Sequence, residues 1–87
     1  MKEIILESLS SPGCHNCAIF EEFWHSIEKD FSNVKYKNLN LLDPEGMEMA
    51  SKYSIFASPG IVINGELFSV GGVDKEKFIE KIKSLSA

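Results

Sequence analysis

The sequence contains no arginine, only two cysteines and no long hydrophobic run. Its nine basic residues are all lysines, and thirteen acids give the chain a formal net charge of −4. Arginine is the side chain that recognises phosphates and base edges in a planar, two-pronged geometry. An acidic chain without arginine therefore lacks the composition of a nucleic-acid-binding protein.

The first apolar segment, residues 4–6, is ended by Glu7. This segment is too short for the core of a signal peptide and for a membrane span. We therefore expect a cytoplasmic, monomeric protein without a membrane partner. A length of 87 residues, with 44% hydrophobic content, predicts one globular domain over residues 1–87.

Both cysteines lie in one C-x-x-C motif, Cys14-His15-Asn16-Cys17. No further cysteine is present to form a structural disulfide, whereas a small secreted domain held together by disulfides needs more of them. The pair is therefore a candidate for redox chemistry or for metal binding.

Hydrophobic periodicity and turn signals predict four strands and three helices, in the order β-α-β-α-β-β-α. Aromatic and aliphatic side chains recur at helical spacing after Cys17, and they are expected in the core with Met47 and Met49. The predicted strands cover residues 4–6, 34–42, 60–63 and 66–70, and the predicted helices cover about 14–30, 44–52 and 75–85.

Three segments carry more specific local signals. In the second predicted strand, Tyr36 and Leu39 lie in opposite phases of the alternation, which indicates either a bulge or a strand covered on both faces at one end. Asp43 is expected to cap the second helix, and Gly46 to weaken it. An Asn-Gly pair at residues 64–65 predicts a tight hairpin.

Three features resemble the thioredoxin and glutaredoxin family. The C-x-x-C lies between a strand and a helix, Ser58-Pro59 precedes a strand that ends in an Asn-Gly hairpin, and Gly71-Gly72 precedes the last helix. The resemblance covers nearly the whole chain. It implies an α/β, thioredoxin-like domain with a central four-stranded mixed sheet and three helices.

The sequence also departs from both named groups. Thioredoxins carry tryptophan where this chain has Gly13, Gly-Pro where it has His15-Asn16, and a buried acid where it has Ser8. Glutaredoxins have Pro-Tyr or Pro-Phe between the cysteines. The subfamily therefore stays open, although the chain length is closer to that of glutaredoxin.

The C-x-x-C spacing suits thiol–disulfide exchange. Two cysteines at i and i+3 of a helix bring their Cα atoms to about 5–6 Å, within the range of a disulfide. The start of a helix favours a thiolate, so we expect Cys14 to attack and the more shielded Cys17 to resolve the mixed disulfide. The pair itself is then the redox group, with no other cofactor and no metal. His15 and Asn16 are expected to tune the redox potential, although His15 also fits an exposed histidine of little effect.

The resemblance assigns a role to Ser58 and Pro59. It implies a cis proline beside the cysteines, with the backbone of Ser58 available to a substrate. Without the resemblance, Pro59 is an ordinary trans proline at a strand start. Gly71 and Gly72 form either a turn before a helix cap, which we favour, or a carboxylate-binding helix end as in glutathione-using glutaredoxins.

Three functions remain in competition. The favoured one is an oxidoreductase that acts on a disulfide-containing protein or a small thiol and is served by an upstream reductase or glutathione. The second is a C-x-x-C metal-binding module, although the chain offers only two cysteines and two histidines. The third is an interaction domain that uses the disulfide as a switch.

Overall fold

Four strands form one mixed sheet in the order β2-β1-β3-β4 in the computed structural model, which describes residues 2–87. The central strand β1 is parallel to β2 and antiparallel to β3, and β4 is antiparallel to β3. The chain order confirms the predicted fold. The elements are β1 (Ile4–Ser10), α1 (His15–Ile27), the short 3₁₀ helix η1 (Glu28–Asp30), β2 (Val34–Asn40), α2 (Pro44–Tyr53), β3 (Gly60–Ile63), β4 (Glu66–Val70) and α3 (Lys75–Ser86).

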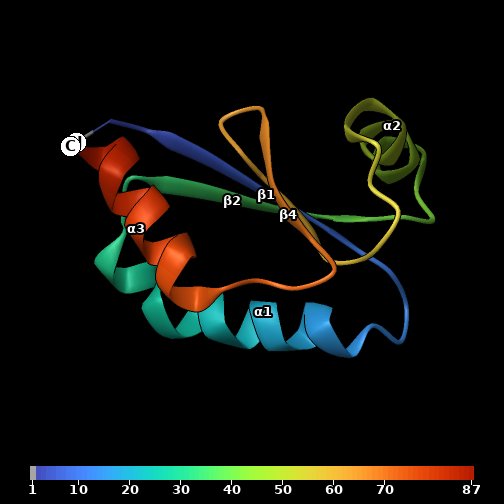
Figure 1. Cartoon of the computed structure of the whole chain (residues 1–87), viewed down its shortest axis with the longest axis horizontal. Helices are drawn as coiled ribbons and strands as arrows, with labels where there is room; N and C mark the ends of the chain where they lie inside the picture. The colour runs from blue at the N-terminus through green and yellow to red at the C-terminus, as the bar shows by residue number, and fades with distance from the viewer. Residues whose placement is uncertain (1) are drawn as a thin grey trace.

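Helices cover both faces of the sheet, with α1 and α3 on one side and α2 on the other (Figure 1). The strand β3 is buried at every position, and its side chains alternate between the two apolar clusters. The larger cluster consists of Ile4, Leu6, Phe20, Trp24, Ile61, Ile63, Phe78 and Ile82. The smaller one, beneath α2, consists of Leu9, Leu39, Met49, Ile55 and Val62.

The two faces of the strand β2 carry packed side chains at different places, one face in its first half and the other near its end, which explains the change of phase in its sequence. The pairing of β1 with β2 runs without interruption from Ile4 opposite Val34 to Ser10 opposite Asn40, so this pair contains no bulge. Tyr36 packs against the cluster under α1, whereas Leu39 belongs to the cluster under α2.

Some predicted boundaries were wrong. The first strand extends to Ser10 rather than to residue 6, because hydrogen bonds to its parallel neighbour continue beyond the apolar segment. The long first helix ends at Ile27, and a 3₁₀ turn follows it. The predicted second strand ends at Asn40.

The second helix differs from expectation in its details. Asp43 occupies the N-cap position, but its side chain makes no capping hydrogen bond. Met47 is 52% exposed and therefore not a core residue, whereas Met49 is buried. Gly46 is buried because this helix packs closely on the end of β2, where a Cβ at position 46 would overlap the Asn40 carbonyl oxygen.

Candidate active site

The two cysteines form a disulfide at the start of α1, with a Cα separation of 5.2 Å. Cys14 is the N-cap residue in an extended conformation, and its Sγ accepts a hydrogen bond from the main-chain N–H of Cys17 at 3.1 Å. Gly13 has φ of +73°, a left-handed conformation that suits glycine in the turn before the helix. The helix thus begins as the spacing of the motif predicts.

The two sulfur-bearing residues differ in their access to solvent. Cys14 is half-buried at the tip of the helix, whereas Cys17 is only 5% exposed. A bulky disulfide can therefore approach Cys14 more easily than Cys17. His15, between them, is exposed.

Ser11, in the loop before the motif, connects Cys14 to a distant segment of the chain. The carbonyl oxygen of Ser11 accepts a hydrogen bond from the Cys14 N–H at 3.3 Å. Its hydroxyl lies 2.7 Å from the hydroxyl of Ser58, close enough for a hydrogen bond in either direction. The loop before the C-x-x-C motif is therefore held against the loop that precedes β3.

The peptide bond between Ser58 and Pro59 is cis, as the family resemblance implies. The Pro59 ring is fully buried, and Ser58 is half-buried. The Pro59 carbonyl oxygen accepts a hydrogen bond from the Gly71 N–H at 3.0 Å. Within residues 2–87, the Ser58 N–H and carbonyl make no backbone hydrogen bond, so both remain available.

Asn16 connects α1 to the Gly71-Gly72 pair through a hydrogen bond. Its side-chain amide donates a hydrogen bond to the Gly71 carbonyl oxygen at 2.9 Å. Gly71 has φ of +82°, which few other residues tolerate, whereas Gly72 has open space at its Cα. Two successive hydrogen bonds thus connect the Asn16 side chain to Gly71 and Gly71 to Pro59.

The helix after the glycine pair is capped by its own residue. The Asp74 carboxylate accepts a hydrogen bond from the Lys77 N–H at 3.1 Å. A carboxylate therefore already occupies this helix end, which agrees with the interpretation of Gly71-Gly72 as a turn before a cap.

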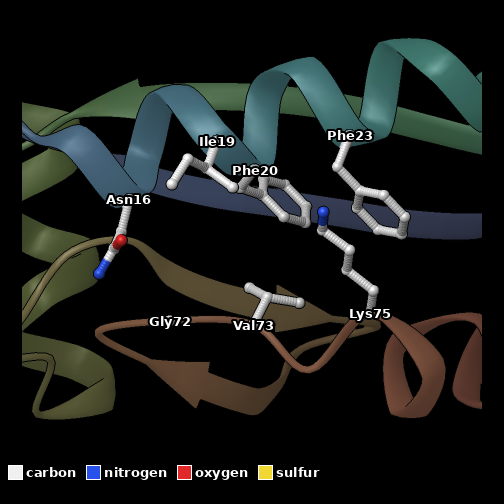
Figure 2. A pocket seen from close by; sticks show the side chains of 7 residues that line it. All are labelled: Asn16, Ile19, Phe20, Phe23, Gly72, Val73 and Lys75. Atoms are coloured by element: carbon white, nitrogen blue, oxygen red, sulfur yellow. The ribbon is translucent and has the colours of Figure 1, made fainter.

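A groove of about 260 Å³ lies between α1 and the segment that leads into α3, and Asn16 of the C-x-x-C motif is one of its lining residues. Figure 2 shows the α1 side chains on one wall, facing Val73 and the extended side chain of Lys75. The Lys75 ammonium lies 5.5 Å from the centre of the Phe23 ring, within cation–π range. The groove is lined by Asn16, Ile19, Phe20, Phe23, Gly72, Val73 and Lys75.

A polar network lies further along α1. Burial and a hydrogen bond to Glu21 raise the pKa of the Tyr36 hydroxyl. The pKa of His25 is also raised, chiefly by a hydrogen bond to Glu28 and further by the charge of Glu21. The same Glu21 carboxylate accepts a hydrogen bond from Asn38 at 2.8 Å.

Neither a metal cluster nor a membrane-spanning helix is found in the described part of the chain. No group of three or more His, Cys, Asp or Glu residues among residues 2–87 is arranged to hold a metal ion. None of the helices described there has the length and hydropathy needed to cross a bilayer.

The structure brings together most of the residues that the sequence singled out, and it adds others. Ser11 was not among the predicted site residues, because an isolated serine in a loop carries no pattern that reveals a partner 47 positions away. The groove residues Ile19 and Val73 were also missed, since the sequence predicts only that they belong to a helix and a loop.

Known proteins resemble the chain in sequence and fold. The thioredoxin-domain family model matches residues 3–84. A thioredoxin from Methanocaldococcus jannaschii is 30% identical over 84 residues, which cover 95% of this chain and 96% of the relative. Two solved structures share the fold at lower identity. They are Fasciola hepatica thioredoxin (22% identity, TM-score 0.75, 94% of this chain and 80% of that one) and a ferredoxin:thioredoxin reductase–thioredoxin f2 complex (12% identity, TM-score 0.77, 99% and 80%).

The family match extends over nearly the whole chain, and the C-x-x-C pair stands at the start of α1 as an intramolecular disulfide. Such a pair is itself the redox group of thioredoxin-family proteins, which generally need no external cofactor. The chain therefore belongs to the thioredoxin family and is a thiol–disulfide oxidoreductase.

Proposed function

We propose that Cys14 is the attacking thiolate and Cys17 the resolving thiol. The Cys14 thiolate attacks one sulfur of a substrate disulfide, so that a mixed disulfide forms and the other substrate sulfur leaves as a thiolate. The Cys17 thiolate then attacks the Cys14 sulfur, which releases the second substrate thiol and forms the Cys14–Cys17 disulfide. Two electrons pass from the dithiol to the substrate, and an external dithiol or two thiols restore the reduced enzyme.

The difference in exposure between the two cysteines carries this assignment. Cys17 is 5% exposed and Cys14 is half-buried, so a substrate sulfur reaches Cys14 first. The N–H of Cys17 also points at the Cys14 sulfur, and the start of α1 adds partial positive charge. Both effects favour a thiolate at Cys14 over one at Cys17.

We assign substrate binding to the segments around the disulfide. The free N–H and carbonyl of Ser58 suit strand-like pairing with a peptide that contains the substrate cysteine. The buried Pro59 ring fixes the position of this segment. We assign Gly71 and Gly72 to the same binding surface, because the Gly71 N–H donates a hydrogen bond to the Pro59 carbonyl. His15 is exposed next to Cys14, and we assign it to the tuning of the redox potential.

We propose a disulfide-bearing protein or the disulfide of a small thiol compound as the substrate and an upstream dithiol reductase or glutathione as the electron donor. The structural similarity to a thioredoxin seen in complex with its reductase favours a reductase as donor. The two cysteines are both committed to the redox pair, a usage typical of reducing compartments, and we place the protein in the cytoplasm.

A thiol-trapping titration of the purified, metal-free protein in thiol/disulfide buffers tests the proposed function. We expect one two-electron transition between about −120 and −270 mV, the range of thioredoxin-fold oxidants and reductants. A value near the lower limit indicates a reductant, and one near the upper limit an oxidant or isomerase. Failure to form the disulfide at any potential, or thiols that react only after a chelator is added, would instead support the metal-binding module.

A further inference from the structure

Ser11 and Asn16, which flank Cys14 in the sequence, each connect the redox motif to the segment at residues 58–59 through hydrogen bonds. On one side, Ser11 contacts Cys14 through its carbonyl oxygen and Ser58 through its hydroxyl. On the other side, Asn16 contacts the Gly71 carbonyl, and the Gly71 N–H contacts the Pro59 carbonyl. Both paths begin at the redox motif, and they end at the adjacent residues 58 and 59.

We propose that Ser11 and Asn16 are positioning residues that hold the substrate-pairing backbone of Ser58 at a fixed place relative to the Cys14 sulfur. This inference rests on the proposed pairing of a substrate peptide with Ser58. Neither side chain reacts with the substrate. Each acts by fixing one side of the segment at residues 58–59, Ser11 directly and Asn16 through Gly71.

The geometry of disulfide exchange explains why such positioning matters. The attacking sulfur must approach along the axis of the substrate disulfide, and small misplacements of reacting atoms lower rates strongly. The Cys14 sulfur stands on α1, whereas Ser58 stands on a loop of its own between α2 and β3. More than forty residues separate these two segments along the chain, so their relative placement depends on contacts between them. These contacts include the hydrogen bond between the Ser11 and Ser58 hydroxyls at 2.7 Å and the one from the Asn16 side-chain amide to the Gly71 carbonyl oxygen at 2.9 Å.

The positioning role predicts a difference between two kinds of substrate. A peptide disulfide can pair with Ser58, whereas hydroxyethyl disulfide has no backbone to pair and needs only access to Cys14. Loss of either side chain should therefore slow reduction of the peptide and leave reduction of the small disulfide unchanged. A role in tuning the thiol would instead affect both substrates, since both react with the same sulfur.

The test measures kcat and KM for a short synthetic peptide with an internal disulfide and for hydroxyethyl disulfide, with dithiothreitol as the reductant. We expect Ser11→Ala and Asn16→Ala each to lower kcat/KM for the peptide by about fivefold, mostly through kcat, because the bound peptide disulfide is then misplaced relative to the Cys14 sulfur. Ser11→Thr, which retains the hydroxyl, should recover most of the loss. Ser26→Ala, which removes an exposed hydroxyl bonded to the Phe23 carbonyl on α1, is the matched control.

The outcomes separate this inference from the proposed function. If the wild-type protein reduces neither substrate, the proposed function fails and the inference fails with it. If the wild-type protein reduces both and the variants lose activity equally on both, or on neither, only the positioning role is overturned. Thermal unfolding of each variant checks that the fold is retained, and a loss on the peptide alone in the folded Ser11→Ala protein, reversed by Ser11→Thr, supports the inference.

Discussion

The main-chain N–H of Cys17 donates a hydrogen bond to the Sγ of Cys14 at 3.1 Å, one helical turn away from the cap. This contact makes Cys14 the N-cap of α1 and satisfies one of the otherwise unpaired N–H groups of the first turn. After reduction, the same N–H faces a sulfur that can carry negative charge. The first turn therefore stabilises the group that the proposed mechanism uses as nucleophile.

The cysteine roles lead to opposite results for the two single substitutions. We expect Cys14→Ser to abolish disulfide reduction, because no accessible thiolate remains, and Cys17→Ser to accumulate a mixed disulfide at Cys14, because resolution is blocked. Mass spectrometry of the trapped adduct identifies the sulfur that carries the substrate. An adduct that forms on Cys17 in the Cys14→Ser protein, and not on Cys14 in the Cys17→Ser protein, would reverse the assignment.

Substitution of Gly71 and of Gly72 distinguishes a conformational requirement for glycine from a role in substrate binding. Gly71→Ala should lower the free energy of unfolding by about 1 kcal/mol, because alanine disfavours the left-handed conformation at φ of +82°. Gly72→Ala should leave stability unchanged, since no atom lies within 4 Å of the added Cβ. Urea unfolding measures both. If Gly72→Ala also leaves peptide KM unchanged, Gly72 does not contact the substrate and serves only in the turn.

The close approach of α2 to the end of β2 makes Gly46 a sensitive position. A Cβ added at position 46 would overlap the Asn40 carbonyl, so the backbone must shift. We therefore expect Gly46→Ala to lower the free energy of unfolding, measured in urea, by more than about 2 kcal/mol. Intrinsic helix propensity alone predicts the opposite sign. Glu48→Ala, at an exposed position of the same helix, is the control, and a Gly46→Ala protein as stable as wild type would show that the packing is not tight.

The raised pKa of His25 predicts a dependence of stability on pH. Because its hydrogen bond to Glu28 and the charge of Glu21 favour the protonated form in the folded state, the stabilisation is fully present below the unfolded pKa of about 6.5. It is lost as pH rises through the higher folded pKa. The difference in urea midpoint between wild type and His25→Asn should therefore be larger at about pH 6 than at about pH 8. An equal difference at both values would mean that the ion pairs contribute nothing.

The sequence alone was sufficient where the controlling contacts are local. The spacing of Cys14 and Cys17 already placed both on the first turn of a helix, because i and i+3 share a face. The Asn64-Gly65 pair predicted the hairpin between β3 and β4, and both residues do adopt positive φ. The continuous apolar segment at residues 60–63 likewise predicted a strand, and β3 is buried at every position.

The sequence left other features open because long-range packing controls them. The change of phase at Leu39 fits a bulge as well as a doubly covered strand, and only the placement of α2 over that face distinguishes the two. Met47 and Met49 are chemically equivalent in the sequence. The orientation of α2 on the sheet exposes the first and buries the second.

The redox motif, the order of the elements and the family follow from the amino-acid sequence alone, since these depend on residue type and short spacing. The assembly of the site around the motif depends on the folded chain. Ser11 meets Ser58 and Asn16 meets Gly71 across separations of 47 and 55 residues. Single hydrogen bonds between distant loops leave no periodic signal in a sequence, because they depend on how the sheet brings the ends of its strands together.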